Sequence, residues 1–495
     1  MKHLGKKLTS VIAAVLAVVM ALALAPTAYA AGSGYKLTLT GTATGHTYEA
    51  YQIFTGDLST KEDGTKVLSN VKWGEGVTYT GTESAADVAK ALGDGTMTIA
   101  QLEEKLTLTT PAKTVASAKD STVIDGLDAG YYLVKDKDGS QADKNDAYTK
   151  FIVQVVGDTE AKIKSDVPTV VKKVKDTNDS TGTTSDWQDS ADADINDDVQ
   201  YQITGTMPSN IADYTTYKYV FTDTMSKGLT YTAKNAKVTI GGKDVTSSFT
   251  ETVTANADGT TTVTWACDNL KGIEGVTLDA NTKVVVTYSA KLNENAVLGA
   301  AGNPNEVDLT YSNNPNKGGE GETGKTPKDK NIVFTYKTVV NKVDQDKKSL
   351  AGAAFRLEKK QSDGTYKTVK EFTAGEETSF EFKGLDDGDY KLTETTTPAG
   401  YNTISPIEFT ISAEHDADST NPALTSLSGN VTTGEATFTV EKDAGSLTTD
   451  VVNKKGSTLP STGGMGTTIL YVAGAAIVVA AGVGLAIRRN KRRDA

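Results

Sequence analysis

The chain of 495 residues contains one cysteine, Cys267, so no disulfide can form within it. Its three histidines, His3, His46 and His415, leave little material for histidine-based catalysis or for a multi-histidine metal site. The sequence also lacks a nucleophile elbow, a zinc motif and a glycine-rich phosphate loop. We therefore predict no cofactor and no bound metal, and an enzyme is the least favoured class of function.

Glycine and proline are not abundant enough to prevent folding. With 46 glycines and 11 prolines, the chain lies far below the roughly 25–30 % that marks low-complexity sequences. The length is sufficient for about three domains. The 63 acidic side chains exceed the 51 basic ones, giving a net charge of −12. Such a surface repels phosphate backbones, so we expect no nucleic-acid partner.

The first thirty residues have the layout of a secretory signal peptide. Lysines lie near the start, an apolar run extends from Val11 to Ala25, and Ala28-Tyr29-Ala30 forms a small-x-small cleavage site. A permanent N-terminal anchor is the alternative, but the helix-breaking Pro26 disfavours it. We expect residues 1–30 to be removed after export.

The last part of the chain, residues 459–495, begins with the pentapeptide Leu459-Pro460-Ser461-Thr462-Gly463 and continues into a candidate membrane span. The stretch from Ile469 to Ile487 carries no charge and is long enough to cross a bilayer, and a basic cluster follows it. This arrangement resembles the Gram-positive cell-wall sorting signal that sortases read. The resemblance implies that a sortase cysteine attacks the Thr462 carbonyl and releases everything from Gly463 onward. The predicted recognition residues are Leu459, Pro460, Ser461, Thr462 and Gly463.

Between the two ends, alternating apolar and polar segments predict three β-rich domains, at residues 31–165, 166–335 and 336–455. We expect each domain to be a β-sandwich. The first domain should also contain two helical insertions, at 84–92 and 98–106, and the helix at 98–106 should start with a Thr98/Gln101 capping box. A Gly-Leu-Asp-x-Gly turn followed by Tyr-x-Leu occurs in the first and the third domain, which favours an array of related modules. The stretch 316–330 has the composition of a flexible loop or linker.

Three polar residues of the second domain fall on apolar strand faces. By alternation, Lys172 shares a face with two valines, Asn313 with a valine, a leucine and a tyrosine, and Asp223 with two aromatic residues. Burial would lower the pKa of the lysine and raise that of the carboxyl, so a neutral amine could attack the asparagine amide. The product would be a Lys–Asn isopeptide bond. A surface lysine, a turn asparagine and a capping aspartate are the alternative reading.

The third domain carries a more extensive pattern. Its segments are Asn341-Lys342-Val343-Asp344, a box from Tyr390 to Tyr401, and Val451-Val452-Asn453. These motifs resemble the Cna-B-type domain of Gram-positive pilins and adhesins. The resemblance implies a self-formed bond from Lys342 to Asn453, with Glu394 as the acid/base.

Motifs of the second domain also resemble a pilin module, the isopeptide-forming middle domain of fimbrial shaft proteins. In that resemblance Lys172, Asp223 and Asn313 take the corresponding roles, with Lys173 and Asn314 as fallbacks. The first domain shows no comparable pair, so we predict no bond there.

A covalent polymer also needs an acceptor amine. In shaft pilins this lysine lies near the junction of the first two domains, within a motif that has an aromatic-Pro-Lys centre. The junction here lacks that motif, so Lys164 is the candidate by position and Lys162 the alternate, against the equal alternative of an ordinary exposed lysine.

One acidic run partly matches a calcium-binding loop but lacks two residues that such a loop requires. Asp192-Ala193-Asp194-Ile195-Asn196 starts like a calcium loop, but Asp197 and Ile203 stand where an EF-hand requires glycine and glutamate. We interpret the run as a solvated loop.

Together these features predict an all-β chain of tandem Ig-like, Cna-B-type sandwiches with a transmembrane helix in the precursor. The resemblance implies a structural subunit of a pilus shaft on a Gram-positive cell wall, whose only chemistry is self-catalysed isopeptide formation. Its partners would be sortase, identical subunits, minor or tip pilins, and peptidoglycan. The alternative is a minor or tip pilin, or a monomeric wall-anchored adhesin that binds host matrix or glycan.

Overall fold

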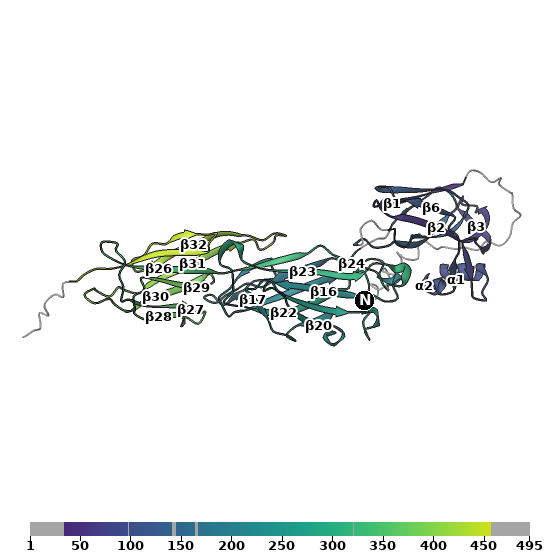
Figure 1. The fold of residues 1–495 in the computed structure, drawn as a ribbon. Helices are drawn as coiled ribbons and strands as arrows, with labels where there is room; N and C mark the ends of the chain where they lie inside the picture. The colour runs from purple at the N-terminus through teal and green to yellow at the C-terminus, as the bar shows by residue number, and fades with distance from the viewer. Residues whose placement is uncertain (1–33, 98, 141–144, 164–166, 320, 457–495) are drawn as a thin grey trace, which may run out of the picture.

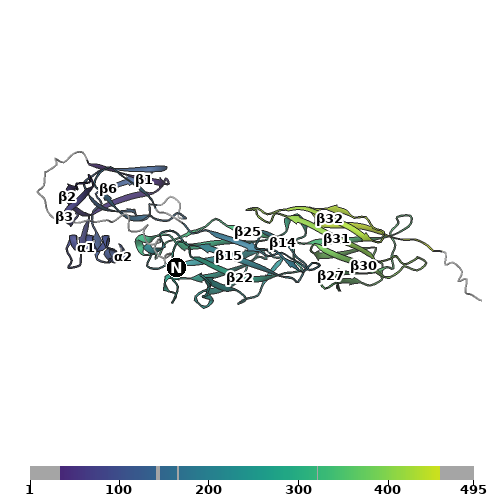
Figure 2. The same ribbon diagram turned by 180° about the vertical axis from the view of Figure 1, so that it is seen from behind.

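The computed structural model describes residues 34–97, 99–140, 145–163, 167–319 and 321–456. They form three β-rich modules along one long axis, with the first set to one side of the second (Figures 1 and 2). Within these residues, no helix is long and apolar enough to cross a membrane. The predicted signal peptide, Lys164, the sorting pentapeptide and the span 469–487 lie outside them.

The first module packs two main sheets and two short helices. One sheet has the order β10-β1-β7 and the other β3-β2-β8-β9, with β6 also paired to β2 and a separate pair β4-β5. The helix predicted at 84–92 is confirmed as α1, where the Ser84 side chain accepts a hydrogen bond from the Asp87 N–H at 3.1 Å. The second helix is shorter than predicted, because the chain leaves it to form β5. The elements are β1 (Tyr35–Thr42), β2 (Thr47–Thr60), β3 (Lys66–Trp73), β4 (Val77–Tyr79), α1 (Ala85–Gly93), α2 (Ile99–Glu103), β5 (Leu106–Leu108), β6 (Lys113–Ala116), β7 (Asp120–Leu127), β8 (Gly130–Asp136), β9 (Lys150–Val155) and β10 (Thr159–Lys162).

The second module is a sandwich of two larger sheets. One has the order β11-β15-β22-β18-β19 with β17 also on β22, and the other β14-β25-β23-β16-β21-β20 with β24 also on β23. The elements are β11 (Val170–Val174), β12 (Thr177–Asn178), β13 (Thr183–Thr184), β14 (Ser190–Asp192), β15 (Asp198–Thr206), η1 (Ile211–Asp213), β16 (Tyr219–Met225), β17 (Leu229–Tyr231), β18 (Lys237–Ile240), β19 (Lys243–Asp244), η2 (Thr246–Ser248), β20 (Thr250–Ala255), β21 (Thr261–Cys267), η3 (Leu270–Gly272), β22 (Lys283–Leu292), η4 (Gly299–Ala301), β23 (Asn303–Ser312), η5 (Pro315–Lys317), β24 (Thr323–Lys325) and β25 (Asp329–Phe334).

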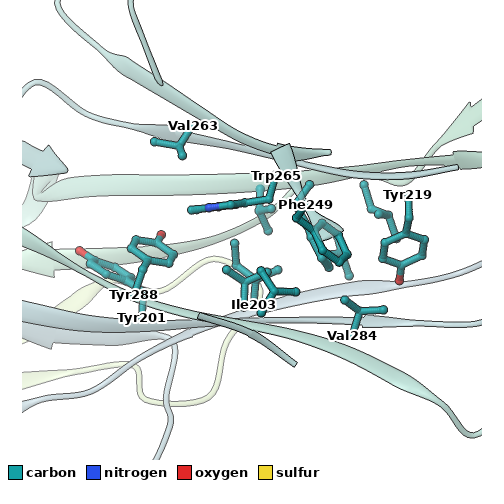
Figure 3. Close-up of a cluster of buried hydrophobic side chains, with 14 of the residues drawn as sticks. Tyr201, Ile203, Tyr219, Phe249, Val263, Trp265, Val284 and Tyr288 are labelled. Carbon is teal, nitrogen blue, oxygen red and sulfur yellow. The ribbon is translucent and has the colours of Figure 1, made fainter. Parts of the chain in front are cut away.

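The core of this second module is rich in aromatic side chains. Every second residue of β16 and β22 is buried, as expected for strands with one face toward a core. Tyr201, Trp265 and Tyr288 gather between the sheets (Figure 3), and Tyr201 and Tyr288 stack with their ring centroids 5.2 Å apart. Such rings exclude water from the polar groups that lie next to them.

The prediction of a flexible linker at 316–330 is wrong. This stretch contains β24 and the start of β25. β24 pairs with β23, and the Lys325 N–H donates to the Asn145 side chain of the first module at 3.1 Å. Composition missed this because the segment is ordered by its neighbours, one of them in another module.

The third module is a smaller sandwich with sheets β29-β26-β34-β33 and β28-β27-β30-β31-β32. Its first strand, β26, lies parallel to its last strand, β34, with Lys342 opposite Val451 and Asp344 opposite Asn453. The elements are β26 (Tyr336–Asp344), β27 (Ala354–Lys360), β28 (Tyr366–Phe372), β29 (Ser379–Leu385), β30 (Gly388–Thr396), β31 (Ile407–His415), β32 (Leu424–Thr433), β33 (Thr439–Glu441) and β34 (Ser446–Asn453).

The repeated turn noted in the sequence has the same geometry in both modules. The Tyr132 hydroxyl donates to the Asp128 carbonyl at 2.9 Å, and the Tyr390 hydroxyl donates to the Asp386 carbonyl at 3.0 Å. In each case a tyrosine of the following strand fastens the turn that precedes it. The repeat therefore reflects a common way of joining two strands.

The second and third modules approach each other closely at two glycines. Gly299 and Gly445 both have positive φ, at 73° and 61°. A Cβ added to Gly445 would lie 2.5 Å from the Gly299 nitrogen, which real Cβ atoms essentially never do. Glycine is thus required on both sides of this contact.

We expect Gly445→Ala to lower the free energy of unfolding by about 2 kcal/mol more than Gly364→Ala, because it adds a backbone clash to the same conformational cost. Gly364 has a similar φ of 81° and nothing within 4 Å of an added Cβ. Chemical denaturation of both variants measures the difference. Equal losses of stability would show that the contact is not tight.

Candidate functional site

Lys172 is fully buried in the second module. Its side chain points inward from β11, and its amine donates to the Tyr288 hydroxyl at 2.6 Å and lies against the Asp223 carboxyl. The Tyr288 hydroxyl in turn donates to Asp223 at 2.8 Å. The predicted neighbours Lys172 and Asp223 therefore do lie together, each with 0 % of its surface exposed.

Burial pushes both of these groups toward their neutral forms. It lowers the pKa of Lys172 against the opposing attraction of Asp223, and it raises the pKa of Asp223 against the opposing effect of Lys172. The Tyr201 and Tyr288 rings, 5.2 and 5.1 Å from the amine, add to this water-free environment. A neutral amine beside a protonated carboxyl is a nucleophile beside a proton donor.

The asparagine at this site is Asn305, on β23. Its side-chain N–H donates to the Tyr288 hydroxyl at 2.9 Å, the same oxygen that accepts from Lys172. Asn305 is fully buried, and its carbonyl oxygen has no hydrogen-bond partner among the described residues. The amine, the carboxyl and the amide thus meet around one tyrosine hydroxyl.

The sequence prediction of Asn313 for this position is wrong. Asn313 lies roughly 25 Å farther along the same strand direction. Its side chain donates to the Asp146 carbonyl at 3.0 Å, and its own carbonyl accepts from the Tyr148 N–H at 2.9 Å, both in the first module. Alternation placed it on the correct face, but Asn305 has the same parity and lies opposite Met225, two residues from Asp223. Asn305 and Tyr288 are the residues that sequence reasoning missed.

The third module brings its three predicted residues together. Lys342 lies on β26, Glu394 on β30 and Asn453 at the end of β34, with exposed fractions of 0 %, 5 % and 0 %. The Asn453 side-chain N–H donates to Glu394 at 3.1 Å and also to the Asn402 carbonyl. Lys342 and Asn453 come close because β26, the first strand of the module, pairs with β34, the last.

In the third module, burial acts on the lysine in the same direction as in the second. Burial lowers the pKa of Lys342 to about 8, against the opposing effects of Glu394 and Asp344. The amine donates to the Val451 carbonyl at 2.9 Å, on the strand that carries Asn453. One oxygen of Glu394 and the side-chain oxygen of Asn453 have no hydrogen-bond partner among the described residues. These oxygens without a hydrogen-bond partner belong to the groups that would react.

The fallback and alternate residues lie elsewhere. Lys173 pairs with Asp189 at 2.7 Å, and Asn314 caps η5 by accepting from the Asn316 N–H at 3.0 Å. Lys162 is exposed at the end of β10. In the described part of the first module, the buried Lys150 is paired with Glu103 at 2.6 Å.

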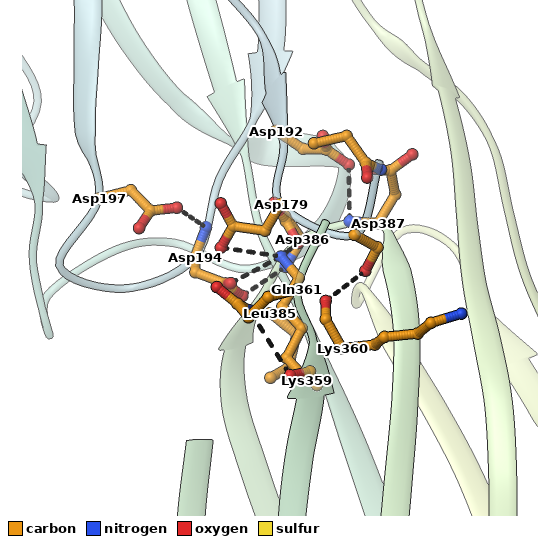
Figure 4. Close-up of polar contacts among 12 residues, drawn as sticks. Asp179, Asp192, Asp194, Asp197, Lys359, Lys360, Gln361, Leu385, Asp386 and Asp387 are labelled. Carbon is orange, nitrogen blue, oxygen red and sulfur yellow. Dashed lines mark hydrogen bonds and ion pairs between the residues drawn. The ribbon is translucent and has the colours of Figure 1, made fainter. Parts of the chain in front are cut away.

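The acidic run at 192–197 is not a solvated loop, contrary to our interpretation. Asp192 is 4 % exposed, and Asp194 accepts from the Lys359 amine at 2.7 Å and from the Asp386 N–H at 3.0 Å (Figure 4). The run is covered by the third module, which local sequence cannot indicate. Lys359 is buried but faces several carboxylates, which raise its pKa, so it stays a charged ion-pair partner.

Family models match three consecutive parts of the chain. Residues 195–315 match the Cna-B-like domain of Gram-positive pilin backbone subunit 2, and residues 337–422 match a prealbumin-like fold domain. Residues 451–493 match the LPXTG cell-wall anchor motif. The first match includes Asp223, Tyr288 and Asn305, and the second includes Lys342 and Glu394.

Relatives agree with these matches. The trypsin-resistant surface T6 protein of Streptococcus pyogenes serotype M6 is 25 % identical over 397 residues, which cover 66 % of this chain and 70 % of that protein. The solved structure of the T6 backbone pilin of the same serotype aligns with a TM-score of 0.53 at 18 % identity, covering 87 % of this chain and all of that one, and so supports the fold. The matched segments are those of a Gram-positive backbone pilin, and the chain is a shaft subunit of a surface pilus that is anchored to the cell wall.

Proposed function

We propose that this subunit is covalently linked to its neighbours by a sortase and that its second and third modules each close on themselves with a Lys–Asn isopeptide bond. The observation that carries the second claim is the burial, in each module, of a lysine, a carboxyl and an asparagine within one polar cluster. Such clusters are costly in an apolar core unless the groups are used or satisfied.

In the second module, the neutral Lys172 amine attacks the side-chain carbonyl carbon of Asn305. The new bond joins Nζ to Cγ, and the bond from Cγ to Nδ2 breaks as ammonia leaves. Protonated Asp223 polarises the carbonyl and passes a proton to the leaving nitrogen, then recovers one from the attacking amine. Tyr288 is a positioning residue, because its hydroxyl holds both the amine and the amide.

In the third module, Lys342 and Asn453 react in the same way with Glu394 as the proton carrier. Glu394 already accepts from the Asn453 amide, and the Thr397 hydroxyl and the Ile404 N–H, each 3.2 Å from one of its oxygens, hold it in place. The reaction is single-turnover, since the product stays in the protein.

The placement of these bonds suits a fibre under tension. Lys342 and Asn453 lie near the same end of parallel neighbouring strands, the first and the last of the module. A bond between them would carry force past the whole stretch of chain between the two strands, so the module could not unzip without breaking an amide.

For polymerisation, we propose that the Thr462 carboxyl is joined to Lys164 of the next subunit, with Lys162 as the alternate. Lys162 is exposed at an edge strand, which supports access by an enzyme. The LPXTG anchor motif supports sortase as the partner.

The two asparagines of the second module give the sharpest test of the bond. We expect the mature chain to weigh about 34 Da less than its sequence predicts, because two molecules of ammonia are lost, about 17 Da each. Asn305→Ala should restore about 17 Da by intact-mass spectrometry, whereas Asn313→Ala should leave the full deficit. The opposite pattern would return the bond to Asn313.

Removal of the third-module bond should be costly. The closed loop spans nearly the whole module, and a cross-link over such a loop is worth about 4–5 kcal/mol. We expect Lys342→Ala to lower the free energy of unfolding by at least about that amount in denaturant titrations.

Lys337→Ala is the matched control on the same strand. It removes only a partly exposed ion pair with Glu381, so it should cost less than about 1 kcal/mol. Similar losses for the two variants would argue against a covalent closure.

The linkage between subunits can be read directly from purified fibres. Tryptic mass spectrometry should find the Thr462 carboxyl joined to Lys164, and Lys164→Ala should abolish the high-molecular-weight ladder on denaturing gels. A ladder that persists with the link on another lysine would refute this acceptor, and a wild-type monomer band alone would refute polymerisation.

A further inference from the structure

The joint between the second and third modules contains buried charge outside the sites described above. β14 and the turn after it meet the β29–β30 turn of the third module, where the Ile195 N–H donates to the Gly384 carbonyl at 3.0 Å. Two groups of side chains here have ligand atoms within 4.8 Å of one another: Asp179, Asp194 and Asp197, and separately Asp176, Asp192 and His415.

The group of Asp179, Asp194 and Asp197 already has a positive charge beside it, the Lys359 amine. The Lys359 amine lies 2.7 Å from Asp194 and 3.6 Å from Asp179, and it also contacts Asp386 (Figure 4). A protonated lysine in this position neutralises the carboxylates. This group therefore needs no metal ion.

The second group has no lysine and contains a histidine with a fixed tautomer. The Ser190 oxygen lies 2.5 Å from the Asp416 carbonyl, which can only accept, so the serine hydroxyl donates there. The same oxygen must then accept from His415 Nδ1–H, 2.8 Å away. The other ring nitrogen, Nε2, faces Asp176 at 3.3 Å.

This arrangement is the one that metal-binding histidines adopt. One ring nitrogen donates to a fixed oxygen, and the lone pair of the other is directed at the site. Without a proton or a metal ion on Nε2, that lone pair would face two carboxylates, Asp176 and the almost fully buried Asp192. A proton or a metal ion on Nε2 is therefore required.

A separate observation comes from Tyr336. Its side chain is fully buried, and its hydroxyl has no hydrogen-bond partner among the described residues. Burial raises the pKa of Tyr336 most, and the charge of Asp192, which lies within hydrogen-bonding reach of the hydroxyl, raises it further. The Tyr336 hydroxyl therefore lies beside Asp192 without a hydrogen bond of ordinary geometry, and water on a bound ion would complete its hydrogen bonding.

We propose that Asp176, Asp192 and His415 bind a divalent transition metal of the Zn²⁺ class, and that the ion fastens the third module to the second. Imidazole nitrogen with two carboxylate oxygens favours Zn²⁺ over Ca²⁺, which prefers oxygen ligands alone. The two aspartates belong to the second module and the histidine to the third, so the ion bridges them. Its charge also balances carboxylates that burial and mutual repulsion otherwise disfavour.

Titration of the chelator-stripped mature chain with Zn²⁺ in a calorimeter tests the proposal. We expect one ion per chain, with affinity at least 100-fold lower in His415→Ala and Asp192→Asn. Ser190→Ala should weaken binding about 10- to 100-fold, because it releases the ring orientation. His46→Ala is the matched control, since His46 is also buried beside aspartates but lies in the first module.

Thermal unfolding with and without Zn²⁺ gives a second readout that does not depend on the variants. Zn²⁺ should raise the unfolding midpoint of the wild-type chain and of His46→Ala, and leave that of His415→Ala unchanged, with circular dichroism confirming that each variant is folded. Absence of saturable binding would overturn the proposal and leave His415 as a protonated partner of Asp176. Binding that survives both ligand variants, or tighter binding of Ca²⁺, would overturn it as well.

Discussion

The structure of this pilin depends on the exclusion of water from a buried lysine amine. In the second and third modules, a strand residue that would normally reach solvent is directed into an aromatic or aliphatic core, where burial favours the uncharged amine. Lys359 shows that burial alone does not decide the outcome. It is almost as buried, yet it faces several carboxylates and stays charged. Direct contact with at most one carboxylate favours a reactive amine, whereas contact with several carboxylates favours an ion pair.

The contacts that join the modules to one another differ in kind from the bonds that we propose to close each module. Between the first and second modules there are hydrogen bonds, in which residues 145–150 meet β24, the end of β23 and the chain after it. Between the second and third modules the contact includes two glycines whose backbones approach closely and a group of carboxylates around Lys359 (Figure 4). A chain with one cysteine thus uses no disulfide at any of these places.

Much of this architecture could be predicted from the sequence, and the failures share one cause. Alternation of apolar residues predicted most strands and the inward direction of Lys172 and Asp223, and helix start and stop signals predicted the first helix. Local pattern could not choose between Asn305 and Asn313, because both have the same parity on one strand and only the pairing of β23 with β16 distinguishes them. The run at 192–197 and the stretch 316–330 were misread for the same reason. Each is ordered by contacts with another module, and such contacts leave no periodic signal in the sequence.

The central claim is that each of two modules closes on itself through a specific lysine and a specific asparagine. Tandem mass spectrometry of cross-linked peptides from the mature wild-type chain tests it most directly. We predict one branched peptide that joins Lys172 to Asn305 and another that joins Lys342 to Asn453, each lacking one ammonia. Unmodified peptides for both lysines, or Lys172 joined to Asn313, would contradict the account.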